Sequence, residues 1–156
     1  MIGGNVGHRL QHLETARKEI SQHLGSISNT SAIYETEAWG INDQSDFLNQ
    51  ALIIETSLSP IECLHKIFSI ENKMGRVRTI KNAPRIIDID ILFYNQLILN
   101  TAELTIPHPE IQNRRFVLIP LDEISPEFNH PQFNKTIHAL LLACTDPLQA
   151  NMIRHN

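Results

Sequence analysis

The apolar positions near the start of the chain recur at helical spacing within a polar segment. The recurring residues are Leu10, Leu13, Ala16, Ile20 and Leu24. Positions three or four residues apart lie on one side of a helix, so this stretch predicts an amphipathic helix with one buried face. Glycine readily adopts the backbone conformation found just after a helix end. The first helix is therefore predicted to end near Gly25.

Two strand-like segments and a second helix follow. Residues 27–37 and 47–56 are rich in Ile, Thr and aromatic side chains, which is typical of strands. The segment Ser59-Pro60-Ile61-Glu62 combines a capping box with a proline at the first helical position. A second helix is predicted to begin there and to end at Gly75.

The segment from residue 87 to residue 91 alternates isoleucine with aspartate. This is the period of a strand with one buried face, and it favours a central strand. Asp88 and Asp90 then leave the same face side by side, where the two carboxylates repel each other unless a cation lies between them. Mg²⁺ prefers such oxygen ligands and usually completes its shell with substrate phosphates. The alternative is a solvated edge strand that carries an aspartate pair.

The rest of the pattern completes a fold of mixed type. It predicts a turn at Asn95-Gln96, a strand at 97–99, and helices around 114–123 and 136–144. This order favours an α+β sandwich with helices packed on a mostly antiparallel sheet. Such a fold opens with a strand, but only Met1-Ile2 precede Gly3-Gly4-Asn5. We therefore expect a truncated first strand, with the natural chain starting upstream. Residues 1–156 are expected to form one domain, loosely held after about residue 146.

Positive charge is concentrated in one segment of an acidic chain. The formal net charge is −4, yet five of the 13 basic residues lie together: Lys73, Arg76, Arg78, Lys81 and Arg85. Arginine offers a planar fork for phosphate oxygens. A local cluster on an acidic protein favours a small phosphate ligand over a nucleic acid.

The two cysteines, Cys63 and Cys144, lie in apolar helical patterns and match no metal-ligand spacing. They are predicted to be buried, reduced core thiols, which is consistent with a cytoplasmic protein. The sequence contains no signal peptide or membrane span, so no membrane partner is expected.

A series of short motifs, in this order, resembles the 6-hydroxymethyl-7,8-dihydropterin pyrophosphokinase family. The motifs are Gly3-Gly4-Asn5, Tyr34-Glu35-Thr36, Phe47-Leu48-Asn49, Gly75-Arg76-Val77-Arg78, residues 84–90, Pro107-His108 and Asn113-Arg114-Arg115-Phe116. The resemblance implies a ferredoxin-like core. It also implies transfer of diphosphate from ATP to the pterin's hydroxymethyl oxygen, with AMP as the other product.

The same resemblance assigns roles on the nucleotide side. It implies that Asp88 and Asp90 bind two Mg²⁺ ions across the triphosphate, and that Asp90 helps to deprotonate the hydroxyl. Arg76, Arg78 and Arg85 join them as catalytic residues. The implied nucleotide-binding residues are Glu71, Arg76, Arg85, Thr105, His108 and Arg114. For Glu71, on the apolar face of its helix, a buried structural ion pair is the alternative.

The pterin is a flat, polar heterocycle, which needs aromatic faces to stack on and amides to read its edge. The resemblance implies that Phe47 and Phe116 stack on it and that Asn49 reads its edge. The other implied pterin contacts are Thr36, Ala38, Trp39 and Gly40.

Three positions depart from the family pattern, namely Asn82 where relatives have an aromatic residue, Glu103 and Pro109. A weaker affinity for phosphate is expected from Glu103, which stands where relatives often carry a cation. Two other functions stay open: another Mg²⁺-dependent nucleotidyl or phosphoryl transferase, and a non-catalytic pterin- or nucleotide-binding paralogue. The protein is expected to act as a monomer on small-molecule substrates.

Overall fold

The computed structural model describes residues 1–38, 44–77 and 83–153. Its elements, in chain order, are β1 (Ile2–Gly4), α1 (Arg9–His23), β2 (Ser26–Thr30), β3 (Tyr34–Thr36), β4 (Phe47–Gln50), β5 (Leu52–Glu55), α2 (Pro60–Lys73), β6 (Asp88–Ile89), β7 (Leu99–Asn100), β8 (Thr105–Ile106), the 3₁₀ helix η1 (Ile111–Asn113), α3 (Arg115–Ile124), α4 (Ile137–Ala143) and β9 (Ala150–Met152).

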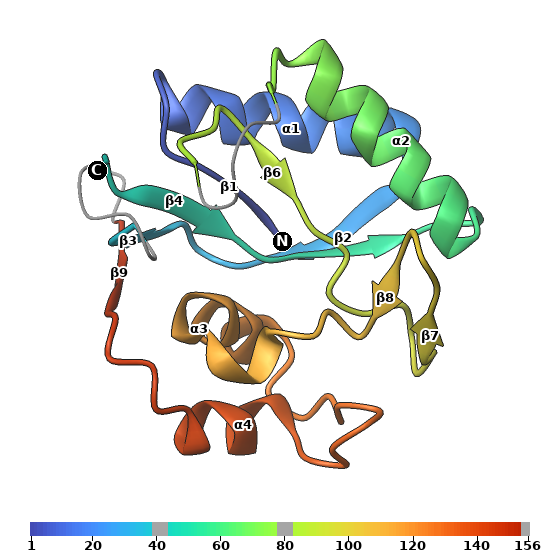
Figure 1. Cartoon of the computed structure of the whole chain (residues 1–156), viewed down its shortest axis with the longest axis vertical. Coiled ribbons are helices and arrows are strands. Elements are labelled where there is room, and N and C mark those ends of the chain that lie inside the picture. The colour runs from blue at the N-terminus through green and yellow to red at the C-terminus, as the bar shows by residue number, and fades with distance from the viewer. Residues whose placement is uncertain (39–43, 78–82, 154–156) are drawn as a thin grey trace.

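An antiparallel sheet lies between two layers of helices (Figure 1). Its strand order is β6-β1-β4-β3-β9, and β2 and β5 form a separate antiparallel pair. Helices α1 and α2 cover one face, and α3 and α4 cover the other. The order β6-β1-β4-β3, with α1 and α2 as connections, is the ferredoxin-like arrangement. The predicted α+β class is therefore confirmed.

Each face of the sheet has its own hydrophobic core. Residues Ile2, Leu48, Ile87 and Ile89 pack with α1 and α2, whereas Ala51 and Leu92 pack with α3 and α4. The side chains of a strand alternate between faces. Asp88 and Asp90 therefore lie on the face opposite Ile87 and Ile89, toward α3, as the sequence predicted for the pair.

The helices form where the sequence predicts them. Ser59 caps α2, since its hydroxyl accepts a hydrogen bond from the Glu62 backbone N–H at 3.4 Å and the Glu62 carboxylate accepts one from the Ser59 N–H at 2.8 Å. Thr136 caps α4 in the same way, accepting from the Ala139 N–H. Cys63 and Cys144 are buried free thiols, as predicted. No helix in the described ranges is long and apolar enough to cross a membrane.

The two long predicted strands are each broken in the middle. At the break, the Ser31 N–H donates to the Ala51 carbonyl, while the Ala51 N–H donates to the Ser31 hydroxyl instead of to a backbone carbonyl. The side-chain amide of Gln50 then donates to the freed Ser31 carbonyl at 2.7 Å. Because side chains replace ladder partners here, the backbone bends without leaving buried polar groups unpaired.

The aspartate-bearing strand is not central, which corrects the prediction from the isoleucine alternation. β6 is two residues long and forms the edge of the five-stranded sheet. Ile87 and Ile89 are nevertheless 0% and 7% exposed, because α1 and α2 cover them. Burial by helices gives the same alternation as burial within a sheet, so the pattern alone could not separate the two cases.

The tail is also more firmly held than the sequence predicts. Residues 150–152 form β9, which pairs antiparallel with β3 from Tyr34 to Thr36. The exposed edge of β3 offers unpaired backbone groups, and the tail satisfies them. Asp146 is buried and accepts hydrogen bonds from the Arg115 and Leu148 backbone N–H groups.

The three residues of β1 pair on both sides, with β4 and with β6. A cavity of about 270 Å³ continues the line of β1 beyond Met1. It lies between β5, whose other edge pairs with β2, and residues 89–95. Since Ile2 is opposite Gln50, the strand register carried beyond Met1 runs past Leu52 and Ile53, whose side chains line the cavity.

Joining a β-branched apolar segment as long as β5 to Met1 should therefore raise the melting temperature. The added backbone can pair with β5, and its side chains can fill the apolar cavity. Burial of about 1.5–3 kcal/mol per apolar side chain and about 0.5–1.5 kcal/mol per new backbone hydrogen bond together exceed the ordering cost of about 1.5–3 kcal/mol per residue, so a net gain of about 2 kcal/mol is expected. Calorimetry should show a rise of about 4–8 °C. A glycine-serine extension of equal length is the control, and equal melting of all three proteins would contradict the prediction.

Candidate functional site

Two clefts meet at the aspartate pair, the first on the α3 side of the sheet and the second reaching from the pair to α2. The first is small, and it is lined by Met1, Gly3, Thr36, Glu37, Phe47, Asn49, Leu92, Phe116 and Val117. The second, of about 530 Å³, extends past α2 to the β7–β8 hairpin. Five residues line both clefts: Arg85, Asp88, Asp90, His108 and Arg114. All five were predicted as site residues from the sequence.

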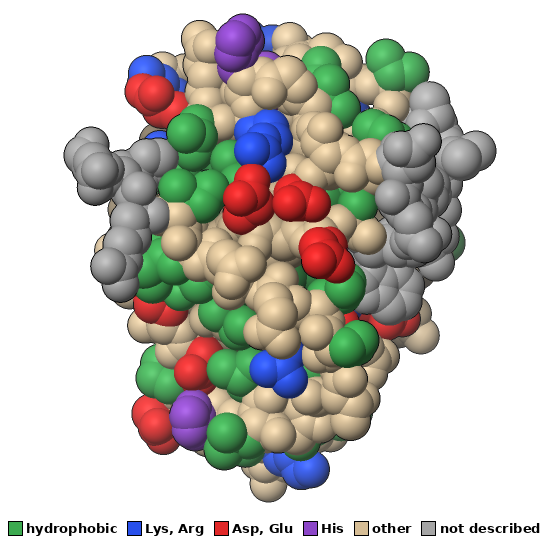
Figure 2. Space-filling model, turned by 90° about the vertical axis from the view of Figure 1, so that its left-hand side faces the viewer, with side chains coloured by type: hydrophobic (Ala, Val, Ile, Leu, Met, Phe, Trp, Pro, Cys, Tyr) green, Lys and Arg blue, Asp and Glu red, His purple; other side chains and the backbone are tan. Residues whose placement is uncertain are grey.

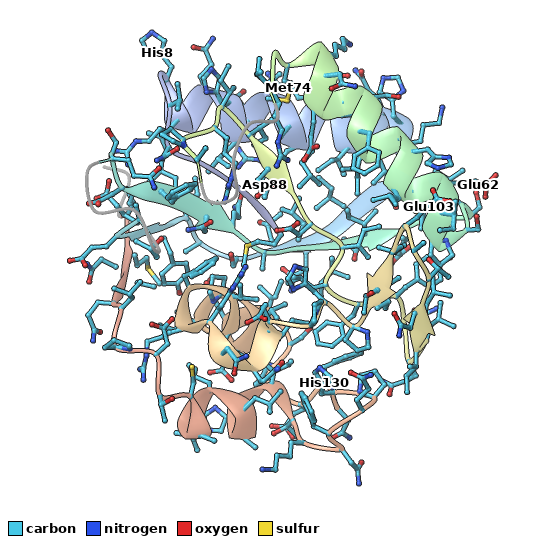
Figure 3. The ribbon with its side chains drawn as sticks, viewed as in Figure 1. His8, Glu62, Met74, Asp88, Glu103 and His130 are labelled. Atoms are coloured by element: carbon cyan, nitrogen blue, oxygen red, sulfur yellow. The ribbon has the colours of Figure 1, made fainter. Side chains whose placement is uncertain are left out.

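Asp88 carries two arginine partners. Arg76 Nη1 donates to Asp88 Oδ1 at 2.5 Å, and Arg85 Nε lies 3.0 Å from Asp88 Oδ2. Asp88 lies near the middle of the molecule, whereas Glu103 lies toward the β7–β8 hairpin (Figure 3). The edge position of β6 explains the Arg76 contact, because Arg76 follows α2 and reaches Asp88 around the open side of the strand.

Two hydrogen bonds with Met1 fix the backbone of Asp90. Its N–H donates to the Met1 carbonyl at 2.9 Å, and the terminal amine of Met1 donates to the Asp90 carbonyl at 3.0 Å. Burial, and next the negative charge of Asp88, raise the pKa of the Asp90 carboxyl above its usual value. A cation bound at the two carboxylates would offset the free-energy cost of ionising Asp90 beside Asp88.

The aspartate pair therefore fits Mg²⁺ in ligand type and charge. In the described part of the chain, no group of three or more His, Cys, Asp or Glu side chains could hold a metal. A cation at Asp88 and Asp90 must complete its shell from water or substrate oxygens, which is the usual mode of Mg²⁺.

Glu71 lies at the buried end of the same network. It is 1% exposed, accepts a hydrogen bond from Arg76 Nη1, and accepts another from the Ile89 backbone N–H at 2.9 Å. Burial lowers the pKa of Arg76, but the charges of Asp88 and Glu71 outweigh it and raise that pKa overall. Glu71 also lines the larger cleft. Its contacts favour the buried ion pair over a direct nucleotide contact.

His108 lines both clefts together with the aspartate pair. Its backbone N–H donates to the Leu92 carbonyl at 2.9 Å, and its Nδ1 accepts from the Glu110 N–H at 3.2 Å. The Nδ1 acceptor role places the ring proton on Nε2. Burial lowers the pKa of His108, with Asp90 acting in the opposite direction. Thr105, which the resemblance assigns to nucleotide binding, lines the larger cleft as well.

The smaller cleft has two aromatic rings and an ordered amide. Asn49 is 4% exposed, and its Nδ2 donates to the Thr36 hydroxyl at 2.9 Å. The guanidinium of Arg85 lies 5.1 Å from the Phe47 ring centre, and that of Arg114 lies 5.9 Å from the Phe116 ring centre. Each ring is thus next to a cation of the shared region.

The structure therefore brings together most of the predicted residues. Ala38 is half-buried but is not among the described residues that line either cleft. Trp39, Gly40 and Arg78 lie outside the described ranges. No individual role was predicted for Gly3 or Asn5. Their one signal was the Gly3-Gly4-Asn5 motif, whose contacts form only in the folded chain.

A charged surface lies beside the strand ends. Arg9 Nη1 donates to the Glu35 carboxylate at 2.8 Å and to the Asp46 carbonyl at 2.7 Å. Figure 2 shows basic and acidic side chains gathered on this side of the molecule. Arg9 thereby links α1 to β3 and to the residue that precedes Phe47.

Comparison with known proteins gives a consistent result. Residues 1–126 match the family model of 7,8-dihydro-6-hydroxymethylpterin-pyrophosphokinase. A 2-amino-4-hydroxy-6-hydroxymethyldihydropteridine pyrophosphokinase of Synechocystis is 41% identical over 90% of this chain and 72% of its own length. An Aquifex aeolicus protein of the same name is 40% identical over 87% of this chain and 84% of its own. The folic acid synthesis protein FOL1 of Dictyostelium discoideum is 41% identical over 90% of this chain, which spans 21% of FOL1.

Solved structures agree on the fold. An HPPK-DHPS in complex with substrates superposes with a TM-score of 0.75 at 20% identity, over 91% of this chain and 42% of that one. The Plasmodium falciparum HPPK-DHPS with pteroate gives a TM-score of 0.77 at 22% identity, over 91% of this chain and 41% of that one.

Proposed function

Because the chain belongs to the 7,8-dihydro-6-hydroxymethylpterin-pyrophosphokinase family, we propose that it transfers diphosphate from ATP to 6-hydroxymethyl-7,8-dihydropterin. The products are AMP and the pterin diphosphate, a step of folate biosynthesis. One observation carries this proposal: two clefts of different chemistry meet at Asp88 and Asp90.

Each cleft suits one substrate. The smaller cleft offers Phe47 and Phe116 as stacking faces, and Asn49, fixed by Thr36, as an amide for the edge of a heterocycle. The larger cleft suits a nucleoside triphosphate. It has apolar walls at Leu64, Phe68 and Leu104, and it carries cations where it joins the smaller cleft.

The transfer needs no protein nucleophile. The hydroxymethyl oxygen attacks the β-phosphorus of ATP, the bond from that phosphorus to the α-phosphate bridging oxygen breaks, and AMP leaves with that oxygen. The hydroxyl proton passes to a base, for which Asp90 is the proposed acceptor at the junction. The chain's task is to align both substrates and stabilise charge, with Arg85 and Arg114 facing the phosphates.

The proposed cofactor is Mg²⁺, bound as two ions by Asp88 and Asp90 together with ATP. When bound, Mg²⁺ supplies charge neutralisation on the phosphate oxygens. For Asp88, the arrangement requires a change of partners, because its two oxygens now face Arg76 and Arg85. Among the described residues, Asp88 is the one carboxylate paired with Arg85, whereas Glu71 also holds Arg76, so Arg85 is the partner that would exchange.

The remaining assignments belong to the same proposal. Arg76 positions Asp88, while Thr105 and His108 contact the nucleotide. Arg78 joins the catalytic residues, Glu71 acts on the nucleotide side through Arg76, and Ala38, Trp39 and Gly40 contact the pterin. We further propose a cytoplasmic monomer.

The function is tested by one assay with the nucleotide products separated. Purified protein, MgATP and hydroxymethyldihydropterin should give AMP in equal amount to the pterin diphosphate, with no turnover when Mg²⁺ is chelated or the pterin is omitted. Phosphorus NMR of the product should show a diphosphate ester. Accumulation of ADP would mean phosphoryl transfer instead. Binding of both substrates without turnover would mean a non-catalytic paralogue.

A further inference from the structure

Asn5 lies where the walls of the two clefts meet, but it does not line either of them. The residue is 4% exposed. Its Nδ2 donates to the Ser45 carbonyl and to Gln44 Oε1, both at 2.9 Å. Its Oδ1 accepts from the Arg85 backbone N–H at 2.9 Å, and its own N–H donates to the Arg85 carbonyl at 3.0 Å. Asn5 thus joins two segments 40 and 80 residues away along the chain.

Each of these segments leads directly to a cleft wall. Ser45 is two residues before Phe47, the ring of the smaller cleft. Arg85 carries the guanidinium that lies 5.1 Å from the Phe47 ring centre and 3.0 Å from Asp88. The buried side-chain amide of Asn5 therefore fixes the separation between the segment that leads to Phe47 and the segment that carries Arg85.

The two glycines before Asn5 make this approach possible. A Cβ at Gly4 would lie 2.2 Å from the Ile86 carbonyl oxygen, so any side chain there would push residues 85–86 away from Asn5. A Cβ at Gly3 would lie 2.4 Å from Asn49 Oδ1 and would displace the amide that Thr36 holds. Both glycines have negative φ, so the requirement is for space and not for an unusual backbone.

We propose that Asn5 is a positioning residue that couples the two substrate walls, with Gly3 and Gly4 providing the space. The proposal rests on the proposed function for its substrates. As a donor, Asn5 Nδ2 orders residues 44–47 for the pterin (the donor side). As an acceptor, Asn5 Oδ1 orders residues 85–88 for the phosphates (the acceptor side). Loss of one side should affect one substrate more than the other, which a residue that only supports folding does not do.

Asn5→Asp separates the two sides because it keeps Oδ1 and replaces the donor by an oxygen that faces Ser45 and Gln44. We expect KM for the pterin to rise about tenfold and KM for ATP to change less than about twofold. Asn5→Ala, which loses both sides, should raise both KM values. Asn29→Asp is the matched control, since Asn29 Oδ1 also accepts a backbone N–H, at 2.9 Å from Thr30, far from the clefts.

Hydrogen exchange of the substrate-free protein provides a readout independent of activity. In Asn5→Asp, peptides covering residues 44–50 should exchange faster while those covering residues 83–88 do not, and in Asn5→Ala both should. Should the Asp variant not fold, Asn5→Ala is compared with wild type alone, and unchanged KM values with unchanged exchange of residues 44–50 and 83–88 would contradict the proposal. If wild type makes AMP but the Asp variant keeps both KM values and its exchange pattern, the coupling role is wrong. If wild type is inactive, the exchange pattern still decides the role of Asn5, and the proposed function fails separately.

Discussion

Replacing Asp90 with asparagine is expected to lower kcat about a thousandfold while leaving the protein at least as stable as wild type. The substitution keeps the shape of the side chain and the backbone bonds to Met1. It removes a carboxylate whose contribution to charge stabilisation at the phosphates is worth several kcal/mol, and each 1.36 kcal/mol is a factor of about ten. Burial and the charge of Asp88 make the ionised form of Asp90 unfavourable in the folded protein. A neutral amide at this position should therefore not lower the free energy of unfolding.

The measurement is a steady-state rate at saturating MgATP and pterin, together with a thermal melt in the absence of Mg²⁺. Asp122→Asn is the matched control, because Asp122 pairs with His138 at 3.0 Å, away from both clefts, and its loss should not change the rate. An Asp90→Asn enzyme with wild-type turnover would remove Asp90 from the proposed metal and proton-accepting roles.

Asp88→Asn should differ from Asp90→Asn in its melting temperature without Mg²⁺. Asp88 is the partner of both Arg76 and Arg85, so its neutralisation leaves the half-buried Arg76 with Glu71 alone. We therefore expect loss of activity together with a lower melting temperature. The two carboxylates share a proposed ligand role, yet only one of them also stabilises the substrate-free protein.

Glu71→Ala is expected to lower the free energy of unfolding by about 3–5 kcal/mol, the second large effect. The change leaves the Arg76 guanidinium without one of its two carboxylates and removes the acceptor of the Ile89 N–H. The Ile89 N–H left without an acceptor costs about 1–3 kcal/mol, and the lost charge-assisted hydrogen bond of Arg76, which keeps Asp88 as a partner, costs about 1.5–3 kcal/mol. Chemical denaturation monitored by circular dichroism measures the change.

Two further variants test which contacts of Glu71 cause the loss of stability in Glu71→Ala. Glu71→Gln keeps an acceptor for the Ile89 N–H and removes only the charge beside Arg76, so it should lose less stability than Glu71→Ala. Glu14→Ala breaks an exposed pair with Lys18 and should change stability by less than about 1 kcal/mol. A similar small effect of Glu71→Ala would contradict the structural role and would favour a direct contact with the nucleotide.

The positions of Arg76 and Glu71 show how far sequence reasoning reaches at this site. The pattern placed Glu71 on the buried face of α2 and predicted that its carboxylate needs a partner. It could not choose between a nucleotide and an ion pair, because the choice depends on where β6 lies. Only the folded chain puts β6 at the sheet edge, where Glu71 meets the free Ile89 N–H and Arg76 reaches Asp88.

The local features of this protein follow from its amino-acid pattern alone. Helical periodicity set α1, α2, α3 and α4, with side-chain caps at α2 and α4, and strand alternation put Asp88 and Asp90 on one face. These features depend on residues a few positions apart. Tertiary structure decided the edge position of β6, the pairing of β9 with β3, and the joining of Ser45 to Arg85 through Asn5. These contacts link residues 40 to more than 100 positions apart, and their energies exist only once the sheet and its helices have packed.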